Sequence, residues 1–97
     1  MRIEVTGRRL DVTDAIREHA EKKVEKILHR FDGVQEIEVI LDQDGSTEFT
    51  AETIVHVVKH DSFVGRAKGD DVYLAIDHAV DKAARQVQEF KERLRSH

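Results

Sequence analysis

The chain of 97 residues contains no cysteine, no proline and no tryptophan. Without cysteine it can form no disulfide, no thiolate metal site and no thiol nucleophile, which fits a reducing compartment. It also has no apolar run long enough for a signal peptide or a membrane-spanning helix. We therefore expect a cytoplasmic protein without membrane contact. Linkers, repeats and low-complexity segments are absent too, so a single domain over residues 1–97 is expected.

Aromatic residues make up only 5% of the chain, whereas charged residues make up 37%. The 16 Lys and Arg against 20 Asp and Glu give a formal net charge of −4. This balance argues against a generic nucleic-acid coat, whose affinity comes from a basic surface that neutralises phosphates. Screening over about 8 Å in physiological salt lets nearby charges dominate. The sorting of charges along the chain therefore matters more than their sum.

The stretch 69–94 predicts an amphipathic helix, because apolar residues recur along it at steps of three and four. Asp70 and Asp71 are expected to cap its first turn. Basic residues line up beside the apolar face, interrupted by Glu89: His78, Lys82, Arg85 and Arg93. Acidic residues take the far side: Asp77, Asp81 and Glu92. Such sorting is typical of a helix that presents its basic residues to a partner. The alternative is a solvated helix with intrahelical ion pairs, such as Asp81 with Arg85.

A second amphipathic helix is predicted from an N-cap at Thr13 to about Arg30, with Asp32 and Gly33 ending it. Its apolar face consists of Ile16, Ala20, Val24, Ile27, Leu28 and Phe31. Basic residues gather along one side of that face: His19, Lys22, Lys23, Lys26 and Arg30. The two helices therefore share one kind of charge sorting.

Alternating apolar residues predict four strands, at residues 2–6, 37–41, 49–57 and 63–67, with a turn at 43–46. The element order β-α-β-β-β-α indicates an α+β fold with a four-stranded mixed sheet. The strand–helix–strand crossover makes the first two strands parallel if they are neighbours, and two hairpins follow. We expect two parallel helices packed on one face, because the other sheet face is polar. Side by side, the helices can merge their basic stripes into one band.

No pattern in the chain predicts catalysis or a cofactor. His56 and His60 are about 13 Å apart in an extended strand, and no acidic or histidine partner stands at ligand spacing, so no metal site is expected. The carboxylates are predicted to be exposed, and nucleotide-binding loops and serine elbows are missing. We therefore expect neither an enzyme nor a small-molecule substrate.

Two stretches resemble the bacterial ribosome hibernation-promoting factor family, also called ribosome-associated inhibitor or sigma-54 modulation proteins. The first is GRRLDVTDAIR at 7–17, continuing through Lys23 and Lys26 to Phe31. The second is AKGDDVYLAID at 67–77, followed by DKAARQ at 81–86. With the element order, this resemblance to the short form of the family covers essentially the whole chain. Glu89 departs from it, since relatives often carry lysine at that position.

The resemblance implies a protein that binds the small ribosomal subunit in the mRNA and tRNA channel. There it would block translation and promote ribosome hibernation under stress and in stationary phase. It implies rRNA phosphate contacts by Lys23, Lys26, Lys82, Arg85, Lys91 and Arg93. The basic stripe of the first helix adds Lys22 and Arg30 to this set. The resemblance also implies structural roles for Tyr73, beside the apolar face, and for Asp71 at the cap.

The alternative function is a protein–protein regulatory module that uses the exposed sheet face. That face carries apolar residues among charges: Ile40, Ile54, Val58 and Val64. Ordinary cross-strand pairing accounts for the same residues. Because this mixed patch is small beside the roughly 1,200 Å² that a stable interface buries, we expect a monomer when the protein is free.

Overall fold

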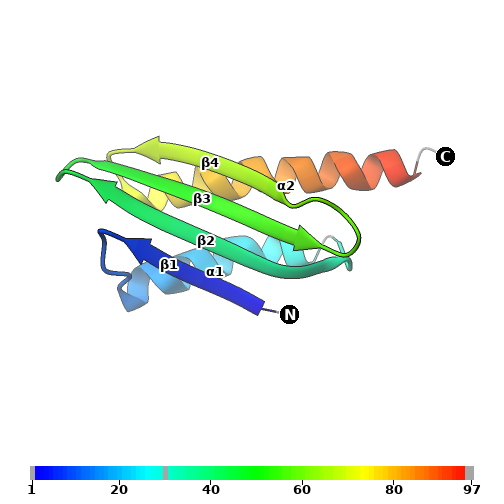
Figure 1. The fold of residues 1–97 in the computed structure, drawn as a ribbon, viewed down its shortest axis with the longest axis horizontal. Helices are drawn as coiled ribbons and strands as arrows, with labels where there is room; N and C mark the ends of the chain where they lie inside the picture. Colours follow the sequence, from blue (N-terminus) through cyan, green and yellow to red (C-terminus); the bar gives the residue numbers. More distant parts are fainter. Residues whose placement is uncertain (1, 30, 96–97) are drawn as a thin grey trace.

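The computed structural model describes residues 2–29 and 31–95. It forms one sheet covered on one face by two helices, in the predicted order (Figure 1). The elements are β1 (Arg2–Arg8), α1 (Asp14–Leu28), β2 (Val34–Asp44), β3 (Glu48–Val57), β4 (Phe63–Gly69) and α2 (Val72–Arg95).

The sheet has the strand order β1-β2-β3-β4. β1 runs parallel to β2, with Ile3 opposite Ile37 and Val5 opposite Val39. β2 with β3 and β3 with β4 form antiparallel hairpins. Both helices start near the same end of the sheet and run side by side in the same direction (Figure 1). The predicted α+β class, mixed sheet and parallel helices are confirmed.

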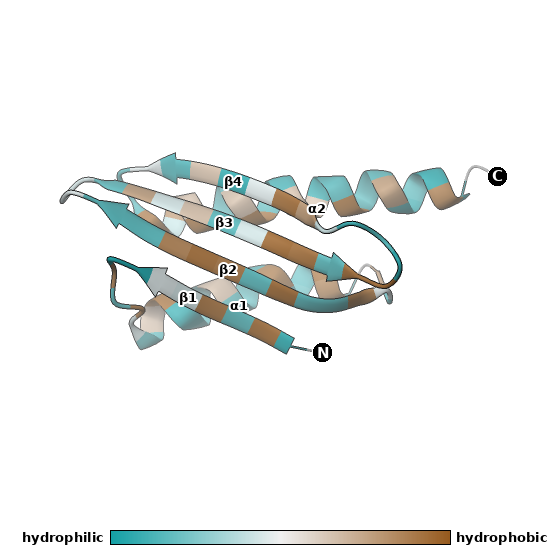
Figure 2. Cartoon of the chain, in the orientation of Figure 1, coloured by the Kyte–Doolittle hydropathy of each residue, from teal (hydrophilic) through white to brown (hydrophobic). Residues whose placement is uncertain are grey.

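The core lies between the helices and the inward-facing residues of the strands. In the middle of β2 every second residue is fully buried, at Ile37, Val39 and Leu41, and the same period of two continues in β3. From α2, Ile76 and Val80 meet them at helical spacing, also fully buried. The outer sheet face alternates with these positions and carries polar stretches between apolar ones (Figure 2). One face of the molecule is therefore helical, and the other is open sheet.

Gly65 lets α2 lie directly against the edge strand β4. A Cβ built on Gly65 would stand 2.2 Å from the Ala79 carbonyl oxygen and 2.6 Å from the Ala83 nitrogen. Both atoms belong to the helix backbone, which cannot rotate away as a side chain can. Gln86 of α2 also donates to the Val64 carbonyl oxygen at 2.6 Å. These contacts fix the height and the rotation of α2 over β4.

The first helix is shorter than the sequence predicts. It begins as expected after Thr13, whose hydroxyl accepts from the Ile16 N–H at 3.2 Å. It ends at Leu28, with His29 as its C-cap. The Val34 N–H bonds back to the Phe31 carbonyl, so residues 31–34 already form the turn into β2. The prediction that Asp32 and Gly33 end the helix is therefore wrong, and Arg30 lies outside the described residues.

The sheet strands are longer than predicted at several ends. β2 starts at Val34 and reaches Asp44, so Gly45, with φ of 69°, makes the turn that was expected at 43–46. β4 extends to Gly69 rather than stopping at 67. Cross-strand hydrogen bonds continue the strands past the point where the apolar alternation ends.

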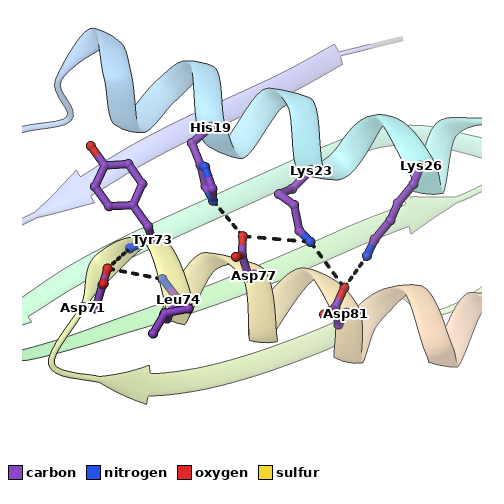
Figure 3. Close-up of polar contacts among 8 residues, drawn as sticks. All are labelled: His19, Lys23, Lys26, Asp71, Tyr73, Leu74, Asp77 and Asp81. Carbon is purple, nitrogen blue, oxygen red and sulfur yellow. Dashed lines mark hydrogen bonds and ion pairs between the residues drawn. The ribbon is translucent and has the colours of Figure 1, made fainter.

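Asp71 caps α2, whereas Asp70 does not take part in the cap. The Asp71 carboxylate accepts from the Tyr73 N–H at 2.9 Å and from the Leu74 N–H at 3.4 Å (Figure 3). We expect Asp71→Ala to lower the free energy of unfolding by about 0.5–2 kcal/mol, because two first-turn donors lose their acceptor. Urea denaturation measures this loss. Asp70→Ala serves as the control and should leave stability nearly unchanged.

Candidate nucleic-acid interface

A row of hydrogen bonds and ion pairs joins the two helices on their solvent-facing side. His19 Nε2 lies 2.6 Å from Asp77 Oδ1. Lys23 Nζ lies between two carboxylates, 3.9 Å from Asp77 and 3.8 Å from Asp81. Lys26 donates to Asp81 as well. We call these five residues the interhelical seam: α1 supplies its bases and α2 its acids (Figure 3).

The seam corrects two expectations. Asp81 contacts Lys23 and Lys26 of α1 instead of forming the predicted intrahelical pair with Arg85. Asp77 and Asp81 also stand where the basic stripes of the two helices were expected to merge, so an acidic row interrupts the band. Helical periodicity placed these acids correctly on the side away from the α2 stripe. It did not show that α1 would lie against that side.

The hydrogen bond from Lys26 holds the pKa of Asp81 below its ordinary value of 3.8, and the charges of Lys26 and Lys23 act in the same direction. A carboxylate whose pKa is lower in the folded than in the unfolded state contributes its full stabilisation at a pH above the unfolded-state pKa. That stabilisation is lost as pH falls through the folded-state pKa. The stabilising effect of Asp81 is therefore present at neutral pH and disappears below the ordinary value.

Asp81→Asn tests this dependence. We expect the variant to be less stable than the wild type at pH 7, with a difference that vanishes as pH falls below 3.8. Because the Asp81 side chain is half exposed, the effect at pH 7 is small. Chemical denaturation of both proteins across this pH range measures it. A difference that stayed constant with pH would mean that the charge of Asp81 plays no part.

The other side of α2 faces the edge of the sheet. Lys82 Nζ donates to the Arg66 carbonyl oxygen of β4 at 2.8 Å, so its stem lies across the sheet edge. Arg85 is exposed on the same flank of the helix and, within residues 2–29 and 31–95, has no ion-pair partner. Lys82 is therefore exposed but tied to the sheet edge, whereas Arg85 is well placed to meet an anion.

The remaining predicted residues are spread along both helices. Lys22 is exposed and lies 3.2 Å from Glu18 in an i,i+4 pair. Near the C-terminal end of α2, Lys91 is half-buried and Arg93 exposed. Lys91 borders a hollow of about 390 Å³ whose walls include Phe31 and Leu94. The structure thus brings Lys23 and Lys26 together at the seam, and places Lys82 and Arg85 on the opposite flank of α2.

Two features of the open face were not predicted from the sequence. A hollow of about 500 Å³ is lined by Arg8, Arg66 and Lys68, and Lys82 borders it from the sheet edge. Elsewhere on this face, Glu36, Glu38 and His56 bring their ligand atoms within 4.8 Å of one another. The expectation that no acidic group stands at ligand spacing from a histidine is therefore wrong. Strand pairing, which spacing along one strand does not reveal, assembles this group.

The β-α-β-β-β-α order, the four-stranded mixed sheet and the two parallel helices on one face are the features of a known class of protein. The family described as "Sigma 54 modulation protein / S30EA ribosomal protein" matches residues 3–95, and the chain belongs to this family.

Particular relatives agree over the whole chain. The chain is 33% identical to the ribosome hibernation promoting factor of Escherichia coli K12 over 97 residues, which is all of both chains. Its fold is similar to the Thermus thermophilus Protein Y N-terminal domain, with a TM-score of 0.82, 35% identity and coverage of 93% of this chain and 99% of that one. A ribosomal subunit interface protein from Coxiella burnetii gives a TM-score of 0.84 at 26% identity, with 95% and 99% covered. Within residues 2–29 and 31–95, neither helix is long and apolar enough to cross a membrane.

Proposed function

We propose that this chain is a cytoplasmic ribosome-binding translation inhibitor that promotes hibernation under stress. It would occupy the mRNA and tRNA channel of the small subunit and act by binding, without catalysis. The observation that carries the proposal is the family match over residues 3–95, together with relatives named for ribosome hibernation and for the subunit interface. The helical face is the surface proposed to meet rRNA.

The two helices offer cations at several places on one face. Lys22 lies on the outer part of α1, Lys23 and Lys26 lie in the seam, and Lys82 and Arg85 lie on the far flank of α2. Because both helices pack on one sheet, these positions keep fixed distances from each other. Phosphate groups along a folded RNA are also fixed in space, so a rigid arrangement of bases loses little entropy on binding.

The seam does not prevent Lys23 and Lys26 from binding phosphate. Exposed ion pairs contribute only about 0.2–1 kcal/mol. The lysine contacts at 3.8 and 3.9 Å are longer than good hydrogen bonds. Moving the Lys23 ammonium group toward a phosphate therefore costs little, whereas Lys26 would have to exchange its hydrogen bond with Asp81 for one with the phosphate. Arg85 has no such pair to break.

The apolar residues of the open face are accounted for by strand pairing. Ile54 and Val64 stand directly opposite each other in β3 and β4. Beside them, Arg66 bonds to Glu52, so charges divide the apolar surface. Val58 is 49% exposed, but it lies beyond the end of β3. We therefore propose a monomer in dilute solution, and no observation favours the alternative of a partner protein on this face.

Sedimentation with purified ribosomes tests the proposal. We expect the protein to pellet with isolated small subunits at low salt, to be released at high salt, and to compete with mRNA and tRNA for its place. Isolated large subunits are the control and should leave it in the supernatant. Equal pelleting with both subunits would show non-specific attachment, and failure to pellet with either would refute the proposed function.

A further inference from the structure

We infer that the open sheet face holds a divalent transition-metal site, of the class that takes Zn²⁺, formed by Glu36, Glu38 and His56. These residues come from two strands. Glu36 and Glu38 are two apart in β2 and so share a face, and His56 of β3 stands opposite Glu36 in the register. All three side chains are half-buried, and the site lies on the opposite face from the helices.

The distances fit one ion among the three side chains. His56 Nε2 lies 2.6 Å from Glu38 Oε2 and 3.8 Å from Glu36 Oε2. Ligand atoms of a tetrahedral zinc site are roughly 3.3 Å apart, as bonds of about 2.0–2.1 Å require. Small rotations of the two carboxylates, one outward and one inward, therefore give the required spacing. Two carboxylates and one imidazole leave a fourth position for water.

Two of the three ligands, His56 and Glu36, already have an outer partner that leaves the metal-binding atom pointing inward. His56 Nδ1 lies 2.8 Å from the Ser62 hydroxyl, which orients the ring with Nε2 toward the glutamates. A hydroxyl can accept a hydrogen bond as well as donate one, so it suits an imidazole that is protonated on Nδ1 and free to ligate through Nε2. Arg2 lies 3.6 Å from Glu36 Oε1, while Oε2 of the same carboxylate faces His56.

The charge balance of this face also favours a cation. Glu4 of β1 stands directly opposite Glu38 of β2, a like-charge pair that destabilises a sheet. Arg2 contacts Glu4 at 2.6 Å and is the basic side chain that the register places beside the glutamates, opposite Glu36. Even with Arg2 paired, three carboxylates crowd this end of β1 and β2. A divalent ion bound by Glu36, Glu38 and His56 offsets that excess. The imidazole ligand favours a transition ion over Mg²⁺ or Ca²⁺, which prefer oxygen ligands.

Calorimetric titration of the full chain with zinc chloride tests the inference. We expect a saturable one-to-one isotherm and a rise of the melting temperature with zinc, because the ion binds the folded sheet. His56→Asn and Glu38→Gln should each abolish the isotherm. Ser62→Ala should weaken binding by about ten- to hundredfold, as loss of a group that orients a ligand does. With cobalt(II) in place of zinc, a strong visible band should mark a four-coordinate centre in the wild type and vanish in His56→Asn.

The control is His78→Asn, which removes an exposed histidine from α2 and should leave zinc binding unchanged. The inference would be overturned if millimolar zinc gave no saturable heat with the wild type. It would also be overturned if His56→Asn and His78→Asn bound zinc equally. In either case the three residues form only an ion-paired surface cluster. Since the site lies opposite the helices, ribosome binding by the His56 variant should match the wild type.

Discussion

Replacing Lys82 and Arg85 together by glutamate is expected to abolish ribosome binding and translation inhibition. The change removes two cations from one flank of α2 and places two anions next to Glu89. A hydrogen bond to a charged group contributes about 1.5–3 kcal/mol, so loss of even one phosphate contact weakens binding by roughly tenfold or more. Repulsion between the new carboxylates and rRNA adds to that loss. Pelleting with small subunits and in vitro translation measure the effect.

Stability must be measured in the same variant, because Lys82 is not free of structural contacts. Its bond to the Arg66 carbonyl oxygen is exposed, and losing it should cost about 0.5–1.5 kcal/mol. The Arg85→Glu single variant avoids that cost and should retain wild-type stability while binding more weakly. The matched control is Arg66→Glu/Lys68→Glu, which makes the same change of charge on the open sheet face. If this control lost ribosome binding and the helix variant kept it, the open sheet would be the rRNA-binding face.

A large effect on stability is expected at Gly65. In Gly65→Ala the new methyl group would overlap the Ala79 carbonyl oxygen and the Ala83 nitrogen, at 2.2 and 2.6 Å. Relief requires α2 to move away from β4, which opens contacts along the buried side of the helix. Overpacking of this kind typically costs about 1–3 kcal/mol. We expect a cost at the upper end of this range, because the methyl group would meet backbone atoms of α2, which cannot rotate away. For a chain of this size that loss lowers the melting temperature by roughly 10–20 °C.

Gly69→Ala provides the comparison within the same strand. A Cβ built on Gly69 meets nothing within 4 Å, and this glycine is not among the positive-φ residues. The substitution should be neutral or stabilise by about 0.4–1 kcal/mol, because alanine restricts the unfolded chain. Thermal unfolding of the two variants separates the effects. Equal melting temperatures would show that α2 can lift from β4 at no cost.

The fold was accessible from the sequence because apolar periodicity records which side of each element is buried. In α2, Ile76, Val80, Ala83 and Val87 stand at steps of four, three and four, and all are buried. In β2, alternation at Ile37, Val39 and Leu41 does the same for the sheet. Once both helices are assigned to one face of the sheet, the short loops require consecutive strands to be neighbours, which leaves one arrangement of strands and helices. Element ends were less accessible, since backbone hydrogen bonds carry β2 beyond its apolar residues.

The surface contacts were not accessible in the same way. Asp77 and Asp81 are placed correctly on their helix by periodicity, but the rotation of α2 against α1 depends on how Gly65 seats the helix on β4. The cluster around His56 depends on strand register. The β2–β3 hairpin keeps one register from Asp44 opposite Glu48 to Glu36 opposite His56, and nothing in the local sequence pattern around His56 indicates that pairing. Both cases need partners that are distant in the chain.

The interhelical seam also bears on how the charge of this surface responds to RNA. Lys23 and Lys26 carry their counter-charges with them, in Asp77 and Asp81. A phosphate that binds either lysine takes the place of a carboxylate, and the carboxylate stays close by. Binding therefore exchanges one anion for another at the lysine. The displaced carboxylate of Asp77 or Asp81 then attracts some of the cations that the phosphate releases. Fewer counterions are then released than the number of basic residues suggests, so the logarithmic dependence of affinity on salt should be shallower than about 0.9 per phosphate contacted.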